Sequence, residues 1–318
     1  MYPRGVKMNM KKIVVAGGGV LGSQIALQSA FCGFDVTIWL RSEGSIERAQ
    51  PKLSRLKEIY LNTLEAMKTN PAAYCRGFSC ESELSADKIN ELKQKVEDAY
   101  DSITLTTSYE EAGNDADLII EAIAEDPKQK IAFYQELAKH IPEKTIIATN
   151  SSTMLPSAFA QYTGRPEKYL ALHFANEIWR NNTAEIMGHP DTGQEYYDAV
   201  CEFAENINMI PLKLKKEQPG YILNSMLVPF LSAAEALYAD GVADFETIDK
   251  TWMLATGAPL GPFRILDVVG LTTAYNIGMM NPKASDPDTI EGKVAAMLKE
   301  KIDAGKTGIN SGEGFYKY

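Results

Sequence analysis

A glycine-rich turn near the start of the chain constrains the fold more than any other feature of the sequence. Residues 17–22 read Gly-Gly-Gly-Val-Leu-Gly, which fits the pattern G-x-G-x-x-G, and they follow a predicted strand at residues 11–16. A strand, a turn of bare backbone and a helix whose N-terminus faces the turn together bind the pyrophosphate of a dinucleotide. The sequence therefore predicts a dinucleotide-binding domain. The expected cofactor contacts here are Gly17, Gly19, Val20, Leu21 and Gly22.

Strands and helices alternate through the first half of the chain. A small-residue helix is expected at residues 20–31, and β-branched runs predict strands at residues 34–40, 103–105, 117–123, 145–149, 169–174 and 183–187. Asp126-Pro127 marks a helix start, because an N-cap acceptor precedes proline in the first turn. This alternation predicts an α/β fold with a Rossmann-type doubly wound parallel sheet, covered by helices on both faces.

Two regions depart from the alternation. Residues 45–100 are charged and helical with no good strand, which predicts a helical arm inserted in the first domain. After residue 212 helical periodicity dominates, with helices expected at 221–238, 245–255, 262–279 and 289–304 and no strong strand. We therefore expect a boundary near residue 208 between a dinucleotide-binding domain (1–208) and a smaller all-α domain (209–318).

Composition excludes several classes of protein. The net charge of −10 argues against a nucleic-acid binder, which needs a basic surface. No apolar run reaches the ~18–20 residues that span a bilayer, and the N-terminus lacks the apolar segment of a signal peptide. The cysteines show no metal-ligand spacing, so we expect no metal, reduced thiols and a cytoplasmic protein. Whether residues 1–9 are native stays open, since Met8 and Met10 are also plausible starts.

Only three histidines are available to accept a proton from an alcohol during hydride transfer. His140 ends a predicted helix and His189 lies in a turn, where we expect it to be solvated. His173 ends an apolar strand, and strand C-termini of such a fold open onto the cofactor. On its own it fits a satisfied core histidine better than a catalytic base. Glu185, on the expected neighbouring strand, could fix its tautomer and raise its basicity.

Two more polar groups have a structural and a functional interpretation. Asn150-Ser151-Ser152 follows a predicted strand and fits either an N-cap cluster or a hydroxyl near a substrate. Asn224 lies near the start of the first long helix of the second domain, as an exposed residue or a substrate contact.

Together these motifs resemble the 3-hydroxyacyl-CoA dehydrogenase family, including 3-hydroxybutyryl-CoA dehydrogenases, over essentially the whole chain. Their order and their spacing both agree with that family. The motifs that carry the resemblance are the glycine loop and residues 150–152, 173–176, 219–224, 257–263, 266–271 and 312–316.

The resemblance implies reversible oxidation of a short (S)-3-hydroxyacyl-CoA, such as 3-hydroxybutyryl-CoA, with a nicotinamide cofactor. It implies that His173 is the catalytic base, that Glu185 orients it, and that Ser152 and Asn224 bind the 3-oxygen of the substrate. It also implies a homodimer formed through the helical domain. The cofactor-side positions that it implies are Glu125, Lys130, Asn150 and Asn176.

The match departs from the family after Asn176. The family commonly has His-Phe-Phe-Asn-Pro and an apolar stretch, whereas residues 177–184 here are polar and charged. A dehydrogenase of a free hydroxy acid or sugar acid therefore stays an alternative. Lys52 and Arg55 on the arm could bind the CoA phosphates or lie on a solvated face. A non-catalytic dinucleotide-binding protein is a third reading, disfavoured by the complete catalytic set.

The cofactor prediction rests on the end of the second strand. An NAD enzyme places a carboxylate there for the ribose hydroxyls, and that carboxylate repels a 2′-phosphate. Here the position is Leu40, and Arg41 and Ser42 follow it as possible phosphate partners. The sequence thus predicts a preference for NADP over NAD. Alternatively, Arg41 points to solvent and the protein uses NAD.

Overall fold

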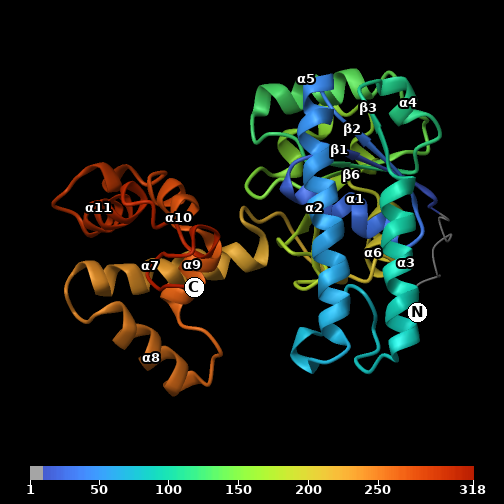
Figure 1. Cartoon of the computed structure of the whole chain (residues 1–318). Coiled ribbons are helices and arrows are strands. Elements are labelled where there is room, and N and C mark those ends of the chain that lie inside the picture. The colour runs from blue at the N-terminus through green and yellow to red at the C-terminus, as the bar shows by residue number, and fades with distance from the viewer. Residues whose placement is uncertain (1–9) are drawn as a thin grey trace, which may run out of the picture. The chain divides into compact units, whose positions relative to one another are not determined.

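The structure is a computed structural model that describes residues 10–318, so the N-terminal segment discussed above lies outside the described residues. The chain divides into two compact units, Met1–Ile222 and Leu223–Tyr318 (Figure 1). The first unit is built on an eight-stranded sheet in the order β3-β2-β1-β4-β5-β6-β7-β8. Its strands are β1 Lys12–Ala16, β2 Asp35–Trp39, β3 Thr104–Thr106, β4 Leu118–Glu121, β5 Ile146–Thr149, β6 Tyr169–Phe174, β7 Thr183–Met187 and β8 Ile210–Lys213.

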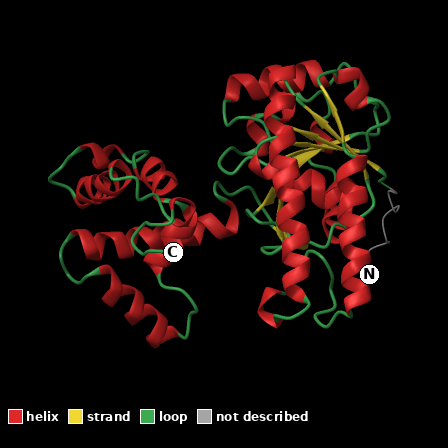
Figure 2. Ribbon diagram, in the orientation of Figure 1, coloured by secondary structure: helices red, strands yellow, loops and turns green. Residues whose placement is uncertain are grey.

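Helices cover both faces of this sheet, as the alternation predicted (Figure 2). Successive strand residues point to opposite faces, so Ile13 packs into one core and Val14 into the other. The first face carries α1 Val20–Phe31, α2 Glu43–Met67, α3 Ala86–Ser102 and α6 Gln194–Asn206. The second carries α4 Tyr109–Gly113 and α5 Pro127–Leu137. The α5 start is as expected, because Asp126 caps it and Pro127 occupies its first turn.

The inserted arm is helical, as predicted, and consists of α2 and α3 side by side (Figure 1). Its loop contacts a distant part of the first unit. Gly77 N donates to Trp179 O at 3.0 Å, and Trp179 is buried against Tyr60 of α2. The polar segment that follows Asn176 is therefore held in part by the arm.

The end of the first unit corrects the predicted boundary near residue 208. β8 pairs in parallel with β7, and the unit continues to Ile222. The strand was missed because Ile-Pro-Leu-Lys contains a proline, which is unusual inside a sheet. Pro211 is tolerated because β8 is an edge strand.

The second unit is all-helical, as predicted. One expected helix, at residues 262–279, is in fact two, because the chain breaks at Gly270 with φ 90°. That backbone conformation favours glycine and ends the first helix. The helices are α7 Tyr221–Ala239, α8 Phe245–Thr256, α9 Pro262–Val269, α10 Leu271–Gly278 and α11 Ile290–Asp303.

Helix α7 corrects the expectation that no apolar stretch is long enough to span a membrane. It has 19 residues and a mean hydropathy of 1.4, so by length and composition alone it could cross one. A core helix of a folded domain passes the same test. Leu231 and Ala234 of α7 are buried in the core of the second unit, which accounts for part of its apolar character.

Three carboxylates are buried in the second unit. Asp267 accepts hydrogen bonds from Phe315 N at 2.8 Å and Tyr316 N at 2.9 Å, and so holds the C-terminal residues. Asp249 does the same for the start of α9. Glu235 of α7 differs, because its Oε1 has no hydrogen-bond partner among the described residues, and burial raises the pKa of its carboxyl to about 7.

Candidate active site

The glycine loop has the shape that a pyrophosphate requires. At Gly17, with φ 119°, an added Cβ would lie 2.5 Å from the Ala122 carbonyl oxygen, so only glycine fits there. At Gly22 a Cβ would collide with the Gly17 carbonyl oxygen, which shows how closely α1 meets the turn. At Gly19 a Cβ would meet nothing within 4 Å, leaving bare backbone open in front of the α1 N-terminus. These three glycines therefore fit a dinucleotide.

A cavity of about 150 Å³ adjoins this loop. It brings together residues from the glycine loop, from the end of β4, from α5 and from the turn after β5. Most of the predicted cofactor-side residues line it. They are Gly19, Val20, Leu21, Gly22, Glu125, Lys130 and Asn150, together with Ser151 and Ser152.

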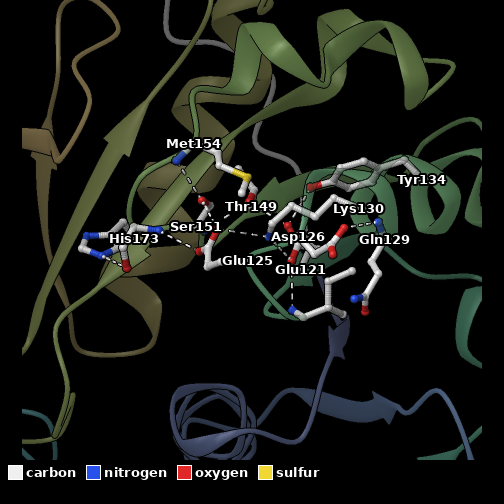
Figure 3. A network of polar contacts seen from close by, with 12 residues as sticks. Glu121, Glu125, Asp126, Gln129, Lys130, Tyr134, Thr149, Ser151, Met154 and His173 are labelled. Atoms are coloured by element: carbon white, nitrogen blue, oxygen red, sulfur yellow. Dashed lines mark hydrogen bonds and ion pairs between the residues drawn. The ribbon is translucent and has the colours of Figure 1, made fainter. Parts of the chain in front are cut away.

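Lys130 supplies a buried positive charge to the cavity. Its side chain is 1% exposed, and its ammonium lies 2.6 Å from Glu121 Oε1 and 3.9 Å from Glu125 Oε2 (Figure 3). A buried cation needs such partners to offset the loss of hydration. Glu125 in turn accepts from the Ser151 hydroxyl at 2.8 Å and from Ser152 N at 3.1 Å. The cofactor side of the cavity is thus tied to the serine turn.

His173 is the centre of a short polar chain. It is 6% exposed at the end of β6, and its Nδ1 lies 3.1 Å from Glu185 Oε2 on β7. The two residues are direct partners in the antiparallel register of these strands. On the other side of the ring, Nε2 lies 3.2 Å from the Ser152 hydroxyl. With the carboxylate at Nδ1, the Nδ1–H tautomer is favoured and Nε2 is left as the proton acceptor.

Tyr221 fixes the plane of the imidazole. The two rings stack with centroids 4.3 Å apart and an interplanar angle of 10°, and the Tyr221 hydroxyl donates to Ser151 O at 2.7 Å. Burial raises the pKa of Tyr221 well above its usual value, so the hydroxyl remains a donor. Ile222 N donates to Glu185 Oε1 at 2.9 Å and so fixes the carboxylate as well.

The end of β2 carries the residues that bear on cofactor choice. Leu40 is 4% exposed and lies against Gly18 of the glycine loop. Arg41 is exposed and donates to Gln129 Oε1 at 3.1 Å. Ser42 is the exposed N-cap of α2. Its hydroxyl lies 3.0 Å from that of Ser45, which also accepts a hydrogen bond from the Arg48 guanidinium.

The remaining predicted residues are less closely tied to the cavity. Asn176 is exposed after β6, and its carbonyl accepts from Asn181. Lys52 and Arg55 are exposed on α2, whereas two other basic side chains of the arm are occupied by Glu97 and Glu65. Asn224 lies in α7 and belongs to the second unit, so its substrate contact stays a prediction.

His189 corrects an expectation. It is 7% exposed rather than solvated, and its Nε2 lies 2.9 Å from Pro166 O. Asp191 N lies 3.3 Å from the other ring nitrogen, Nδ1. It is therefore a satisfied structural histidine. Within residues 10–318, no group of three His, Cys, Asp or Glu side chains gathers as metal ligands.

Sequence reasoning missed two residues of the site. Glu121 ends the apolar run of β4, and a carboxylate in such a run was a signal that a partner is buried with it. Tyr221 stands between Gly220 and Asn224 in a recognised motif, but its stacking depends on its left-handed backbone, with φ 56°. A non-glycine residue in that region is held there by its surroundings.

The fold and the glycine cradle define a nicotinamide-dinucleotide oxidoreductase with a histidine-carboxylate pair beside its cofactor cavity. The chain belongs to the 3-hydroxyacyl-CoA dehydrogenase family. The NAD binding domain of 3-hydroxyacyl-CoA dehydrogenase matches residues 12–218, and the C-terminal domain matches residues 220–318.

Individual relatives match over nearly the full chain. The 3-hydroxybutyryl-CoA dehydrogenase of Clostridioides difficile is 29% identical, covering 96% of this chain and 99% of the relative. The mitochondrial hydroxyacyl-coenzyme A dehydrogenase of Rattus norvegicus is 30% identical, covering 98% and 92%. A solved diketoreductase, described for dual catalysis of dicarbonyl compounds, is 45% identical with a TM-score of 0.84, covering 98% of this chain and 100% of that one.

Proposed function

We propose that this protein interconverts a 3-hydroxy carbonyl compound and its 3-oxo form with a nicotinamide cofactor. The observation that carries the proposal is the polar chain in which His173 lies between the Ser152 hydroxyl and the Glu185 carboxylate. A base with its own orienting carboxylate, beside a dinucleotide cavity, is what the oxidation of a secondary alcohol requires. A bound nicotinamide supplies the hydride acceptor or donor.

His173 handles the proton of the reaction. During oxidation Nε2 accepts the proton of the substrate hydroxyl, and Glu185 stabilises the imidazolium that forms. During reduction the imidazolium returns this proton to the oxygen that forms at C3. The Ser152 hydroxyl, 3.2 Å from Nε2, donates to the same substrate oxygen and places it at the base.

Two substrate classes contain this 3-oxo unit, and they differ in the presence of CoA. The curated relatives support the first, a short 3-oxoacyl-CoA such as acetoacetyl-CoA. The second, a dicarbonyl compound without CoA, is favoured by the 45% identity to a diketoreductase. It is also favoured by the polar segment after Asn176, where the family commonly is apolar. The exposed Lys52 and Arg55 remain available for CoA phosphates.

A spectrophotometric screen tests the proposal and separates the two classes. Acetoacetyl-CoA, longer 3-oxoacyl-CoAs and CoA-free 3-oxo esters and acids are each offered with NADH and NADPH. We expect turnover of at least one 3-oxo compound, and a His173→Gln variant that keeps cofactor affinity while kcat falls at least ~10²-fold. Near-normal turnover in that variant would remove His173 from the mechanism.

Charge reversal on the arm provides the control for CoA. If CoA is bound there, Lys52→Glu with Arg55→Glu raises KM for acetoacetyl-CoA and leaves a CoA-free substrate unchanged. The same reversal of Lys57, which is paired with Glu97, serves as the matched variant.

The proposed cofactor is NADP(H). Leu40 replaces the carboxylate that would repel a 2′-phosphate, and it is buried against the glycine loop. Two exposed guanidiniums follow β2 in the chain: Arg48 donates to the Ser45 hydroxyl and Arg41 donates to Gln129, and both are proposed to turn to the 2′-phosphate when it binds. We expect wild-type kcat/KM to favour NADPH, and a Leu40→Asp, Arg41→Ala double variant to move toward NADH. A wild type that favours NADH would refute this assignment.

The proposed assembly is a homodimer through the second unit. Several large apolar side chains of this unit are exposed, among them Leu254 at 76% and Met280 at 74%. A homodimer through this unit would bury these side chains, and exposed apolar surface marks an interface where it forms one patch. Light scattering should give twice the 35.0 kDa chain mass. A monomer at micromolar concentration would contradict the proposal. The cytoplasmic location stays a prediction.

A further inference from the structure

Glu121 is a fully buried carboxylate at the C-terminal end of β4. Each of its oxygens accepts two hydrogen bonds. Oε1 accepts from Ile123 N at 2.9 Å and Lys130 Nζ at 2.6 Å, and Oε2 accepts from the hydroxyls of Tyr134 at 2.7 Å and Thr149 at 2.8 Å (Figure 3). A buried carboxylate without such partners would be strongly disfavoured. Its four donors come from the loop after β4, from α5 and from β5, so Glu121 fixes these three segments relative to one another.

The contact of Glu121 with Lys130 connects it to the cofactor cavity. Lys130 lines that cavity, and its ammonium is more than 1 Å closer to Glu121 than to Glu125. Glu121 therefore supplies the main counter-charge of Lys130. Replacing its charge would leave the buried ammonium with the more distant Glu125, and the ammonium would move toward that carboxylate.

The contact of Glu121 with Thr149 connects it to Ser152, the serine beside the proposed base His173. The Thr149 hydroxyl has one hydrogen, which it donates to Glu121, so its lone pairs are left to accept Ser151 N at 3.1 Å. That bond fixes the turn whose next residue is Ser152. The Ser152 hydroxyl lies 3.2 Å from His173 Nε2. A rotated Thr149 hydroxyl would release this turn.

We propose that Glu121 is a positioning residue that sets Lys130 on the cofactor side and Ser152 on the substrate side of the same cavity. The inference rests on the proposed function, because it assigns roles within that site. It predicts that one substitution at Glu121 weakens both cofactor binding and turnover. A substitution at Lys130 alone or at Thr149 alone should weaken only one of these two, cofactor binding or turnover.

Glu121→Gln keeps the size of the side chain but places an amide N–H₂ where an oxygen accepted two hydrogen bonds. Hydrogen bonds to charged groups contribute more free energy than bonds between neutral groups. We therefore expect the cofactor Kd to rise about 10-fold and kcat to fall about 10-fold or more. Tyr134→Phe is the matched control. It removes one donor to Glu121 that forms no hydrogen bond with Lys130 or Ser151. The cofactor Kd and kcat should therefore stay within about 3-fold of wild type even where Tm falls.

Thr149 separates the serine connection from general stability. Thr149→Val removes the hydroxyl and should lower kcat about 10-fold with an unchanged cofactor Kd, whereas Thr149→Ser keeps the hydroxyl and should restore kcat. The cofactor Kd is measured by fluorescence titration of the reduced cofactor. The environment of the base is read from the ¹⁵N chemical shifts of the His173 ring, which should move in the valine variant and return in the serine variant.

Two results would overturn the proposal. One is a Glu121→Gln variant that folds with cofactor Kd and kcat within 2-fold of wild type. The other is a Thr149→Val variant whose kcat and His173 shifts equal those of Thr149→Ser, which also decides the matter if Glu121→Gln does not fold. Neither the titration nor the chemical shifts need a substrate. A wild type that turns over no 3-oxo compound would therefore refute the proposed function. The cofactor Kd and the His173 chemical shifts would still test the positioning role of Glu121.

Discussion

The two units of this protein both bury carboxylates, but they satisfy them differently. In the first unit Glu121 holds a buried lysine and borders the cofactor cavity. In the second unit Asp249 and Asp267 accept hydrogen bonds from backbone N–H groups and tyrosine hydroxyls, and they hold the start of α9 and the C-terminal residues. Neutral donors suffice where a carboxylate only fixes the chain. A paired cation is found where the carboxylate also borders a cavity for a charged ligand.

The largest expected effect is on the free energy of unfolding, and it tests whether a carboxylate of the second unit only fixes the chain. Asp267→Ala would leave the buried Phe315 N–H and the part-buried Tyr316 N–H without their acceptor, together with the Tyr318 hydroxyl. Since each unsatisfied buried donor costs ~1–3 kcal/mol, we expect the free energy of unfolding to fall by about 4 kcal/mol, measured by urea denaturation. Cofactor Kd should stay within 2-fold. A rise in Kd like that of Glu121→Gln would show that the two carboxylates do not differ in use.

A smaller effect is expected at Glu235, whose pKa burial raises to about 7. The folded state then binds a proton that the unfolded state has lost, so stability falls as pH rises from the unfolded pKa toward 7 and beyond. Each unit of pKa is worth about 1.4 kcal/mol, which sets an upper limit of about 3 kcal/mol. Glu235→Gln should therefore gain stability relative to wild type between pH 5 and pH 8. Parallel stability curves would show that the carboxyl is not desolvated.

The smallest effect concerns the charge beside the base. Glu185→Gln keeps an acceptor near His173 Nδ1 but removes the charge that stabilises the imidazolium. We expect kcat to fall roughly 10- to 30-fold, with unfolding free energy and cofactor Kd nearly unchanged. Stopped-flow and steady-state rates give the answer. Glu185→Asp, with its shorter side chain, tests whether charge or reach matters. An unchanged kcat would remove the pairing from the mechanism.

The sequence predicted the sheet and the adjacency of His173 and Glu185 because both depend on the pattern of strands, whereas the catalytic roles of the two residues come from the family resemblance and stay a proposal. The alternation of strands and helices gave the doubly wound fold, and the spacing of His173 and Glu185 follows from their direct register on β6 and β7. What it missed depends on tertiary context. Pro211 concealed β8, which is tolerated only at the sheet edge. The four donors to Glu121 come from the loop after β4, from α5 and from β5, and no local pattern brings these segments together.

The position of Tyr221 has a consequence for how the chain can be divided and made. The ring that stacks on His173, and the backbone N–H of Ile222 that fixes Glu185, both lie in the first turns of α7. The family match to the first domain ends earlier, at residue 218. A fragment cut at that point would keep every strand yet lack both groups that hold the side chains of His173 and Glu185. During synthesis, likewise, all eight strands leave the ribosome before Tyr221 can stack on His173 and before Ile222 N can bind Glu185.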